Sequence, residues 1–376
     1  MKIAIFTLNG YENHGNRLQN YAIEKVLSHY GEVNTIFQHS KNYSLDKNNF
    51  LNVYTKYKDL SLSEIYLKIK GEIPIKDYAD SKIRRFLNFK KFSEQNLNEV
   101  HSLINNDKVI GKELSNEYDI FVVGSDQVWN PTWQEGNFYN LLPFETSRKK
   151  ISIAASFGIN DLGTQREWYK TLLKNFDYIT VRENKGIDIL NEMNISSEVC
   201  LDPTLLITIN DWKLQMVEIE EKKKYIMLYF LGELPNELNE ILEMVSGILN
   251  YKIINFNNFR ESYYYSLDPF HFISYINSAE LVLTDSYHGV VFSNIFNTPY
   301  VIFERESNLP KMNSRMETLD IYFEINHRYY LNLKNENRIN IDELFQCEFS
   351  SFNKNIENCR LKSLLTIERM MRGKLE

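Results

Sequence analysis

The sequence has little cysteine: Cys200, Cys347 and Cys359 are the three among 376 residues. They lie far apart and form no C-x-x-C pair, so the sequence predicts neither a disulfide framework nor a zinc site. The H-E-x-x-H pattern and paired acidic triplets, which are typical of metal sites, are missing as well. We therefore expect a chain without a bound metal, in a reducing compartment.

Long apolar runs are also missing. The N-terminal stretch MKIAIFTLNG has one lysine and a short apolar run that ends at Asn9, which is shorter than the apolar region of a signal peptide. No later run is long enough to span a bilayer. Positive charge is not in excess, because the net charge is -7 and the isoelectric point is near 5.7. These absences predict a soluble cytoplasmic protein that does not bind nucleic acid.

The chain is rich in material for a core, with 43% hydrophobic and 14% aromatic residues, and is too long for one typical domain. Short apolar runs of strand length alternate with helical patterns. We predict two Rossmann-like parallel-sheet domains that face each other across a cleft. The predicted domains are residues 1–215, with a helical insertion at about 41–105 that is rich in Asn, Lys, Asp and Tyr, and residues 216–376, which end in a terminal helix.

One stretch, LVLTDSYHGVVFSNIF at 281–296, reads as a buried strand, a polar turn and a buried helix. Ligands of open α/β sheets bind beyond the carboxyl ends of the strands, where a helix start favours an anion. Asp285, Ser286, His288 and Gly289 lie at this point, and His288 is the side chain that changes charge near neutral pH. The alternative is that Asp285 or Ser286 caps the helix and that His288 packs in the core. Capping explains one polar residue but not four in a row, so we favour a ligand site.

Polar residues follow the other predicted strands too. They are Asn16, Asp126, Gln127, Trp129, Ser156, Arg182, Glu183 and Asp202. An arginine and a helix start suit a small ligand that carries phosphate or carboxylate. Several alternatives stay open: Arg182 and Glu183 as a surface ion pair, Asp202 as a turn residue, and Trp129 as rim packing or as a platform for a sugar ring. The G-x-S-x-G elbow of serine hydrolases is missing around Ser156.

The segment SKIRRFLNFKKF, which contains the basic residues Lys82 to Lys91, resembles a basic amphipathic helix able to lie on an anionic membrane. An ordinary helix with a solvated basic face is the alternative. The acidity of the whole chain and the shortness of the segment favour this alternative. Peripheral contact with the inner face of a membrane is kept as a secondary hypothesis.

Several short motifs occur in a fixed order along the chain. They are GNRLQ at 15–19, GSDQVWNP at 124–131, SFG at 156–158, VRE at 181–183, DPT at 202–204 and TDSYHGVVFSNIF at 284–296. In this order they resemble the polysaccharide pyruvyl transferase family. The resemblance implies a fold similar to the GT-B glycosyltransferases and transfer of pyruvate from phosphoenolpyruvate to sugar hydroxyls, usually as a ketal. The acceptor would be a precursor of a cell-surface or capsular polysaccharide, free or lipid-linked, and no cofactor is implied.

The resemblance also implies roles for residues. The family's functional histidine falls on His288, its donor-binding arginine on Arg182, and the aspartate of its GSD motif on Asp126. Some members carry a further arginine two positions before the histidine, where this chain has Ser286, so Arg305 and Arg315 are candidate substitutes. Proton transfer would fall to His288 and Asp126. A GT-B-type glycosyltransferase that uses a nucleotide sugar, or a non-catalytic protein that binds a sugar or an anion, stays an alternative.

Overall fold

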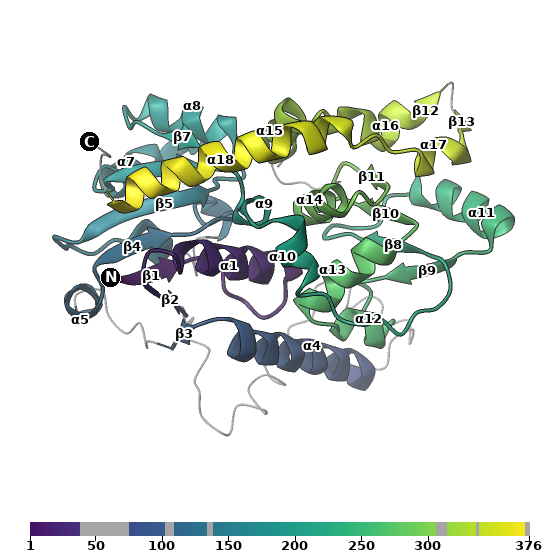
Figure 1. The fold of residues 1–376 in the computed structure, drawn as a ribbon, viewed down its shortest axis with the longest axis horizontal. Coiled ribbons are helices and arrows are strands. Elements are labelled where there is room, and N and C mark those ends of the chain that lie inside the picture. Colours follow the sequence, from purple (N-terminus) through teal and green to yellow (C-terminus); the bar gives the residue numbers. More distant parts are fainter. Residues whose placement is uncertain (38–74, 102–108, 134–137, 306–313, 336–337, 373–376) are drawn as a thin grey trace.

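The computed structural model describes most of the chain (Figure 1). The described residues are 1–37, 75–101, 109–133, 138–305, 314–335 and 338–372. Much of the predicted insertion, residues 41–74 and 102–105, lies outside them.

The first sheet has seven strands, all paired in parallel, in the order β3-β2-β1-β4-β5-β6-β7. The strands are β1 (Lys2–Phe6), β2 (Glu32–Ile36), β3 (Glu99–Val100), β4 (Ile120–Val123), β5 (Lys149–Ala155), β6 (Tyr178–Val181) and β7 (Glu198–Val199). Ile3 and Ile5 of β1 pack in one buried cluster while Ala4 and Phe6 pack in another. Both faces of the sheet are therefore covered, which explains why β4 is apolar at every position and β1 from Ile3 to Phe6.

Helices and short helical turns connect these strands. They are α1 (His14–Leu27), α4 (Ile75–Asn96), α5 (Val109–Glu117), η1 (Pro131–Trp133), η2 (Phe138–Leu141), η3 (Gly163–Gln165), α7 (Arg166–Leu173) and α8 (Asn184–Glu192), and then α9 (Pro203–Leu206) and α10 (Ile209–Lys213), which lead to the second sheet. Part of the predicted insertion belongs to the main fold, because β3 pairs with β2 at the edge of the sheet. The loss of the α/β rhythm in the sequence therefore marks a long connection between β2 and β3.

The second sheet has four parallel strands in the order β11-β10-β8-β9. They are β8 (Tyr225–Tyr229), β9 (Lys252–Asn255), β10 (Leu281–Thr284) and β11 (Tyr300–Ile302). Its other elements are α11 (Leu238–Leu249), α12 (Ser262–Ser266), α13 (Pro269–Ser278), α14 (Tyr287–Phe296), α15 (Ser314–Phe323), η4 (Ile325–Arg328), α16 (Tyr330–Leu333), the hairpin β12 (Lys334–Asn335) and β13 (Arg338–Ile339), and α17 (Ile341–Phe345). The predicted class, an α/β fold with two Rossmann-like parallel sheets, is confirmed.

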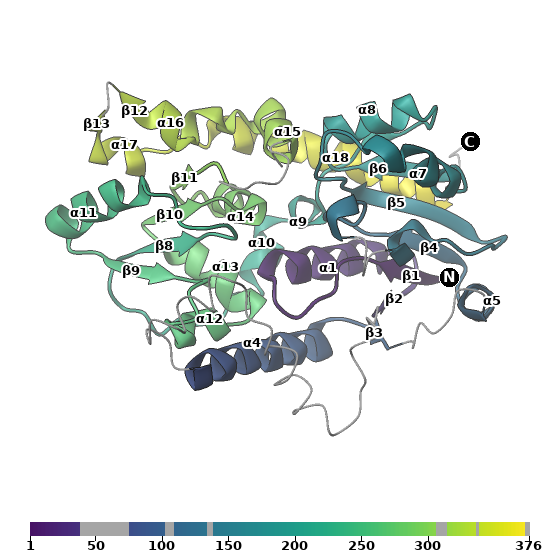
Figure 2. The same cartoon turned by 180° about the vertical axis from the view of Figure 1, so that it is seen from behind.

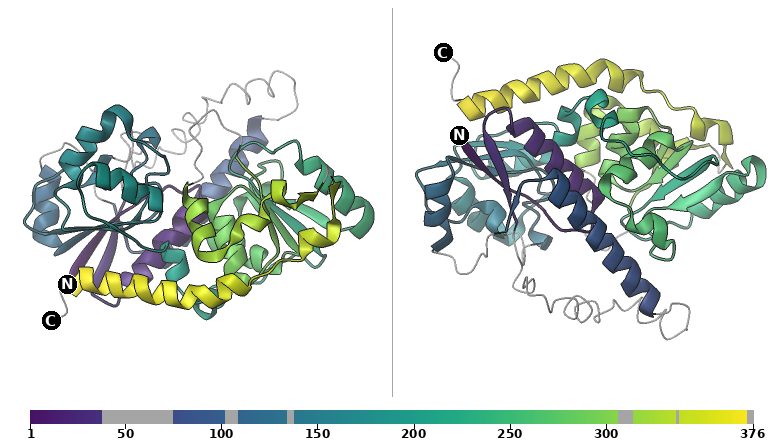
Figure 3. Two further views of the ribbon diagram at one scale, coloured as in Figure 1. Left: turned by 90° about the horizontal axis from the view of Figure 1, so that it is seen from above. Right: turned by 60° about the horizontal axis from the view of Figure 1, so that its bottom comes forward.

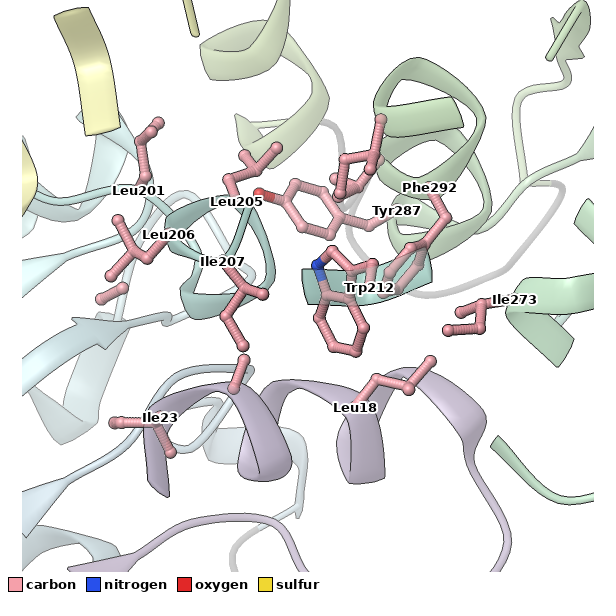
Figure 4. Packing of buried hydrophobic residues seen from close by; sticks show 14 of the residues in the cluster. Leu18, Ile23, Leu201, Leu205, Leu206, Ile207, Trp212, Ile273, Tyr287 and Phe292 are labelled. Atoms are coloured by element: carbon pink, nitrogen blue, oxygen red, sulfur yellow. The ribbon is translucent and has the colours of Figure 1, made fainter. Parts of the chain in front are cut away.

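One apolar cluster runs from the first sheet to the second (Figure 4). Trp212 of α10 is fully buried in it, with its ring centroid 5.7 Å from that of Tyr21 in α1 and 5.1 Å from that of Phe292 in α14. Leu18 and Leu205 of the first part pack in the same cluster. The two sheets are therefore joined by a shared core.

The C-terminal helix α18 (Ser350–Arg372) extends back over the first sheet (Figure 3). Near its start Phe352 lies beside Phe323, with ring centroids 4.8 Å apart. Near its end the Met370 carbonyl accepts a hydrogen bond from Lys149 Nζ at 2.8 Å. The predicted terminal helix thus packs on both sheets and not on the second alone.

Helix α4 lies along the lower side of both sheets in the view of Figure 1, and Figure 2 shows the same from behind. Its Phe89 and Phe92 are buried, and its Arg85 is 3% exposed. Arg85 donates to the carbonyl of Glu12 and, at 2.5 Å, to the carbonyl of Tyr265. Arg85, Phe89 and Phe92 are therefore not available to a membrane surface, whereas Arg84, Leu87 and Lys91 are exposed, and peripheral membrane contact stays a hypothesis. No described helix is long and apolar enough to cross a bilayer.

Candidate active site between the two sheets

The carboxyl ends of β4, β5 and β6 bring predicted site residues together. Asp126 follows β4 and has a φ of 78°, a left-handed conformation that costs a non-glycine residue about 1 kcal/mol or more and that is frequent at functional sites. Ala154 of β5 has a φ of 52°, and the register between β5 and β6 shifts between Ser152 and Ala155. This bulge aligns Ala155 with both Asp126 and Val181. The strand ends therefore meet at one place.

Arg182, which directly follows β6, is held by two carboxylates. Its Nη1 donates to Asp202 Oδ2 at 2.7 Å, and its Nη2 donates to Asp126 Oδ1 at 3.3 Å. All three side chains are buried. Burial opposes the charge of Arg182, but the two carboxylates raise its pKa above the ordinary value. Burial likewise opposes the charge of Asp126, but Arg182 lowers the pKa of that carboxyl.

Asp202 has two tasks, of which the sequence suggested one. Its Oδ1 caps α9 by accepting from the Thr204 N–H and hydroxyl, as expected of an aspartate before a proline. Its Oδ2 accepts from Arg182 and, at 2.9 Å, from Ser125 Oγ. Burial would raise the pKa of Asp202, yet Arg182 and His288 lower it to about 2. Asp202 is therefore a charged part of the site as well as a turn residue.

His288 reaches the same cluster from the second sheet. Its Nε2 lies 3.8 Å from Asp202 Oδ2, which is too long for a hydrogen bond, and has no hydrogen-bond partner in the described part of the chain. Burial lowers the pKa of His288 below its ordinary 6.5, although Asp202 and Asp126 oppose this. The ring is thus neutral at pH 7. It rests against Gly15 of α1, where an added Cβ would lie 2.1 Å from Nδ1.

Two arginines lie over one aromatic ring. The Cζ of Arg182 lies 4.5 Å, and that of Arg315 5.7 Å, from the ring centroid of Tyr287. Tyr287 is the first residue of α14, and Arg315 comes from α15. Because a guanidinium has only donors, the Gln127 amide is favoured with its oxygen towards Arg315, where it accepts at 2.8 and 3.1 Å. The site therefore holds two buried cations side by side.

Other predicted site residues shape the strand ends instead of facing this cluster. Asp285 accepts from the N–H groups of Leu231 and Gly232 at 2.7 and 2.9 Å and from Arg305 Nε at 2.8 Å, so it fixes the loop after β8. Ser286 caps α14 by accepting from the Gly289 N–H at 3.4 Å. An added Cβ at Gly289 would lie 2.5 Å from Thr284 Oγ1, so packing of the helix on the strand already requires a glycine there.

Ser156 and Glu183 form a loop support. Ser156 Oγ and the N–H groups of Phe157 and Gly158 all donate to Glu183 Oε1, at 2.9 to 3.2 Å. Both Arg182 and Glu183 are buried and point to different partners, so the surface ion pair is ruled out. Glu183 Oε2 has no partner among the described groups.

Trp129 is a core residue, which corrects the sugar-platform alternative. It is fully buried, its Nε1 donates to the Asn140 carbonyl at 2.9 Å, and its ring packs beside Phe157. A ring enclosed in this way has no free face for a sugar. Asn16 is partly exposed in the first turn of α1, where its N–H donates to the Asn13 cap at 3.2 Å.

The sequence reasoning missed Tyr287 and gave Arg315 only as one of two substitutes. Tyr287 lies within the polar run that was singled out, but an aromatic before a buried helix is usual in a core. Arg315 follows a segment with no periodic pattern, so its approach to the strand ends had no local signal. Arg305, the other substitute, is paired with Asp285. Within the described residues no group of three or more His, Cys, Asp and Glu side chains is placed to hold a metal ion.

These features define a two-domain Rossmann-like protein with a buried histidine, two arginines and carboxylates at the meeting point of its strand ends. The family model of polysaccharide pyruvyl transferases matches residues 13–307. The chain therefore belongs to the polysaccharide pyruvyl transferase family, as the order of its motifs predicted. No match was found among curated proteins.

Solved structures with a similar fold include three sugar-nucleotide or glycosyl enzymes. A putative UDP-N-acetylglucosamine 2-epimerase from Listeria monocytogenes is 11% identical with a TM-score of 0.47, over 99% of this chain and 97% of that chain. The UDP-GlcNAc 2-epimerase from Methanocaldococcus jannaschii is 12% identical with a TM-score of 0.45, over 98% and 100%. The ADP-heptose LPS heptosyltransferase II of E. coli is 9% identical with a TM-score of 0.39, over 96% and 99%. These likenesses concern the fold alone.

Proposed function

We propose that the protein transfers pyruvate from phosphoenolpyruvate to two hydroxyls of a sugar, forming a ketal on a precursor of a cell-surface or capsular polysaccharide. Membership of the family supports pyruvyl transfer. The observation that carries the proposal is the buried His288, whose Nε2 is unpartnered in the described structure and which directly follows Tyr287, the ring over which Arg182 and Arg315 both lie. A group able to move a proton next to two cations suits a donor with a phosphate and a carboxylate.

The reaction requires two proton movements. The vinyl C3 of phosphoenolpyruvate takes up a proton and becomes a methyl group, while C2 is attacked by one sugar oxygen. The C2–O bond to phosphate breaks, the second sugar oxygen bonds to C2, and the two hydroxyl protons end on C3 and on the released phosphate. The protein must therefore offer a site that gives and takes protons, and donors for the oxyanions.

His288 suits the proton transfers because its lowered pKa keeps the ring neutral and able to accept a proton from a sugar hydroxyl. Once protonated, the ring can donate to C3. Asp126, for which the sequence predicted proton transfer, has a lowered pKa and binds Arg182, so it is a weak base. We assign it, with Asp202, to holding Arg182 in place.

A direct assay tests this function. The purified protein is incubated with phosphoenolpyruvate and a panel of hexose acceptors, both free and lipid-linked, and separately with sugar nucleotides. Pyruvylated sugar and stoichiometric phosphate are the expected products. Glycosylated acceptor from a sugar nucleotide would instead identify a glycosyltransferase. Binding without turnover in either assay would identify a binding protein.

A further inference from the structure

Arg315 is a buried cation without an anionic partner. Its side chain is 9% exposed, and within the described residues it forms no ion pair. The two other arginines near the strand ends are compensated, since Arg182 binds Asp126 and Asp202, and Arg305 binds Asp285. A buried charge normally has a partner of opposite sign, because the cost of removing it from water is high. The pairing at this position is therefore incomplete.

The surroundings disfavour the charge further. Burial and the neighbouring Arg182 lower the pKa of Arg315 to about 10, and Arg305 acts in the same direction. Asp126 and Glu183 act against this, but neither lies within ion-pair distance. Asp126 is bound to Arg182, and one oxygen of Glu183 accepts three hydrogen bonds. Asp126 is thus committed to Arg182, whereas Glu183 keeps one oxygen, Oε2, that has no partner among the described groups and forms no ion pair with Arg315.

Unpartnered polar atoms gather around the same ring. Among the described groups, Arg182 Nε, Arg315 Nε and His288 Nε2 are buried without an acceptor or donor. Both guanidinium groups lie over Tyr287, which directly precedes His288 in α14. Buried donors without acceptors cost about 1 to 3 kcal/mol each, so such a cluster is expected where a ligand completes the bonding.

We propose that Arg315 binds the phosphate group of the donor and supplies the cationic contact that the chain lacks at Ser286. This inference rests on the proposed function. Arg182 is already neutralised by two carboxylates and serves mainly to orient, whereas a phosphate dianion demands a cation that has no anionic partner yet. Binding of phosphate at Arg315 replaces its neutral contact with the Gln127 amide by charge-assisted hydrogen bonds.

Binding of inorganic phosphate, measured by calorimetry on the full chain, tests the assignment without an acceptor or turnover. Arg315→Gln should weaken phosphate and phosphoenolpyruvate binding by about 10- to 100-fold, as expected for hydrogen bonds to a charged group. Arg305→Gln is the matched control and should leave both unchanged. Pyruvate, which has a carboxylate but no phosphate, should lose little affinity in either variant.

Thermal unfolding without phosphate gives an independent readout. Because Arg315→Gln removes an uncompensated buried charge, its melting temperature should equal or exceed that of the wild type. Wild-type phosphate affinity in Arg315→Gln, or a larger loss in Arg305→Gln, would overturn the assignment, as would lost affinity for pyruvate alone. Arg315-dependent phosphate binding in a protein that pyruvylates no acceptor would support the anion site and refute only the proposed reaction.

Discussion

The contact between Gly15 and His288 gives the sharpest test of how the site is built. A Cβ at position 15 would lie 2.1 Å from Nδ1 and 2.5 Å from Cγ of the imidazole, while ordinary contact begins at 3.4 Å. Gly15→Ala therefore forces the ring or the start of α1 to move by about 1.3 Å, the difference between 3.4 and 2.1 Å. The ring has little room, because it is 5% exposed and packs beside Tyr287 and Asp202.

The sign of the change in unfolding free energy of Gly15→Ala distinguishes the two effects that act on it. Alanine in place of glycine inside a helix such as α1 stabilises by up to about 1 kcal/mol when nothing else intervenes. Overpacking instead costs about 1 to 3 kcal/mol, so Gly15→Ala should lower the free energy of unfolding. A displacement of about 1 Å in a catalytic group costs about 100-fold in turnover, so pyruvyl transfer should fall by that order.

Denaturant unfolding and turnover are measured for Gly15→Ala and for Gly10→Ala, whose added Cβ would meet nothing within 4 Å. Gly10→Ala should behave as the wild type. In a His288→Ala background the ring is gone, so Gly15→Ala should no longer lower the free energy of unfolding. The coupling energy between the two substitutions should then equal the cost of overpacking, about 1 to 3 kcal/mol. An equal penalty in both backgrounds would refute the steric reasoning.

Three further results are expected. His288→Gln should unfold like the wild type but lose about 100- to 10,000-fold in turnover. Near-wild-type turnover in a variant with a normal unfolding transition would exclude the acid/base role of His288. Burial raises the pKa of Glu24 to about 7, so its contribution to stability is complete below pH 4.5 and is lost as the pH rises through 7. The unfolding free energy of the wild type should therefore fall by up to about 3 kcal/mol between pH 5 and pH 8, whereas that of Glu24→Gln should stay level. Parallel pH profiles of the two proteins would contradict this. Asp202→Asn keeps the cap to Thr204 but leaves Arg182 with one carboxylate. Calorimetry should show that the free energy of unfolding falls by about 3 kcal/mol or more. An unchanged melting temperature would argue against the buried ion pair.

The sequence predicted the meeting of Asp126 and Arg182 because the rule behind it is geometric, and it predicted that His288 joins them because the two sheets were expected to face each other. Parallel strands present their carboxyl ends at one edge of a sheet, so polar residues after successive strands come together whatever the details of packing. Residue roles depended on partners that the sequence does not reveal. Asp202 was read as a turn residue because its capping oxygen has a local signature, whereas its second oxygen binds Arg182 from 20 positions earlier.

Local patterns also fit more than one tertiary context. The apolar stripe of α4 suits a membrane surface or a core equally well, and Phe89 and Phe92 lie in a core. Trp129 next to a polar loop suits a sugar platform or a buried ring, and it is buried. In both cases the residue type is compatible with two environments, and the long-range packing of the chain decides between them.

The position of the His288 ring depends on residues from both sheets, so the packing of the two sheets against each other sets the geometry of the site. The ring comes from α14 of the second sheet, while Gly15 and Asp202 come from the part of the chain that forms the first sheet. Beside Gly15, the buried His14 receives a hydrogen bond from Arg85 at Nδ1 and lies 3.0 Å from the Leu267 carbonyl at Nε2. Because Arg85 only donates, Nδ1 must accept and Nε2 must carry the proton, which fits a pKa lowered by burial. A neutral His14 therefore ties α1 to the second sheet, and the start of α1 is held where it can support His288.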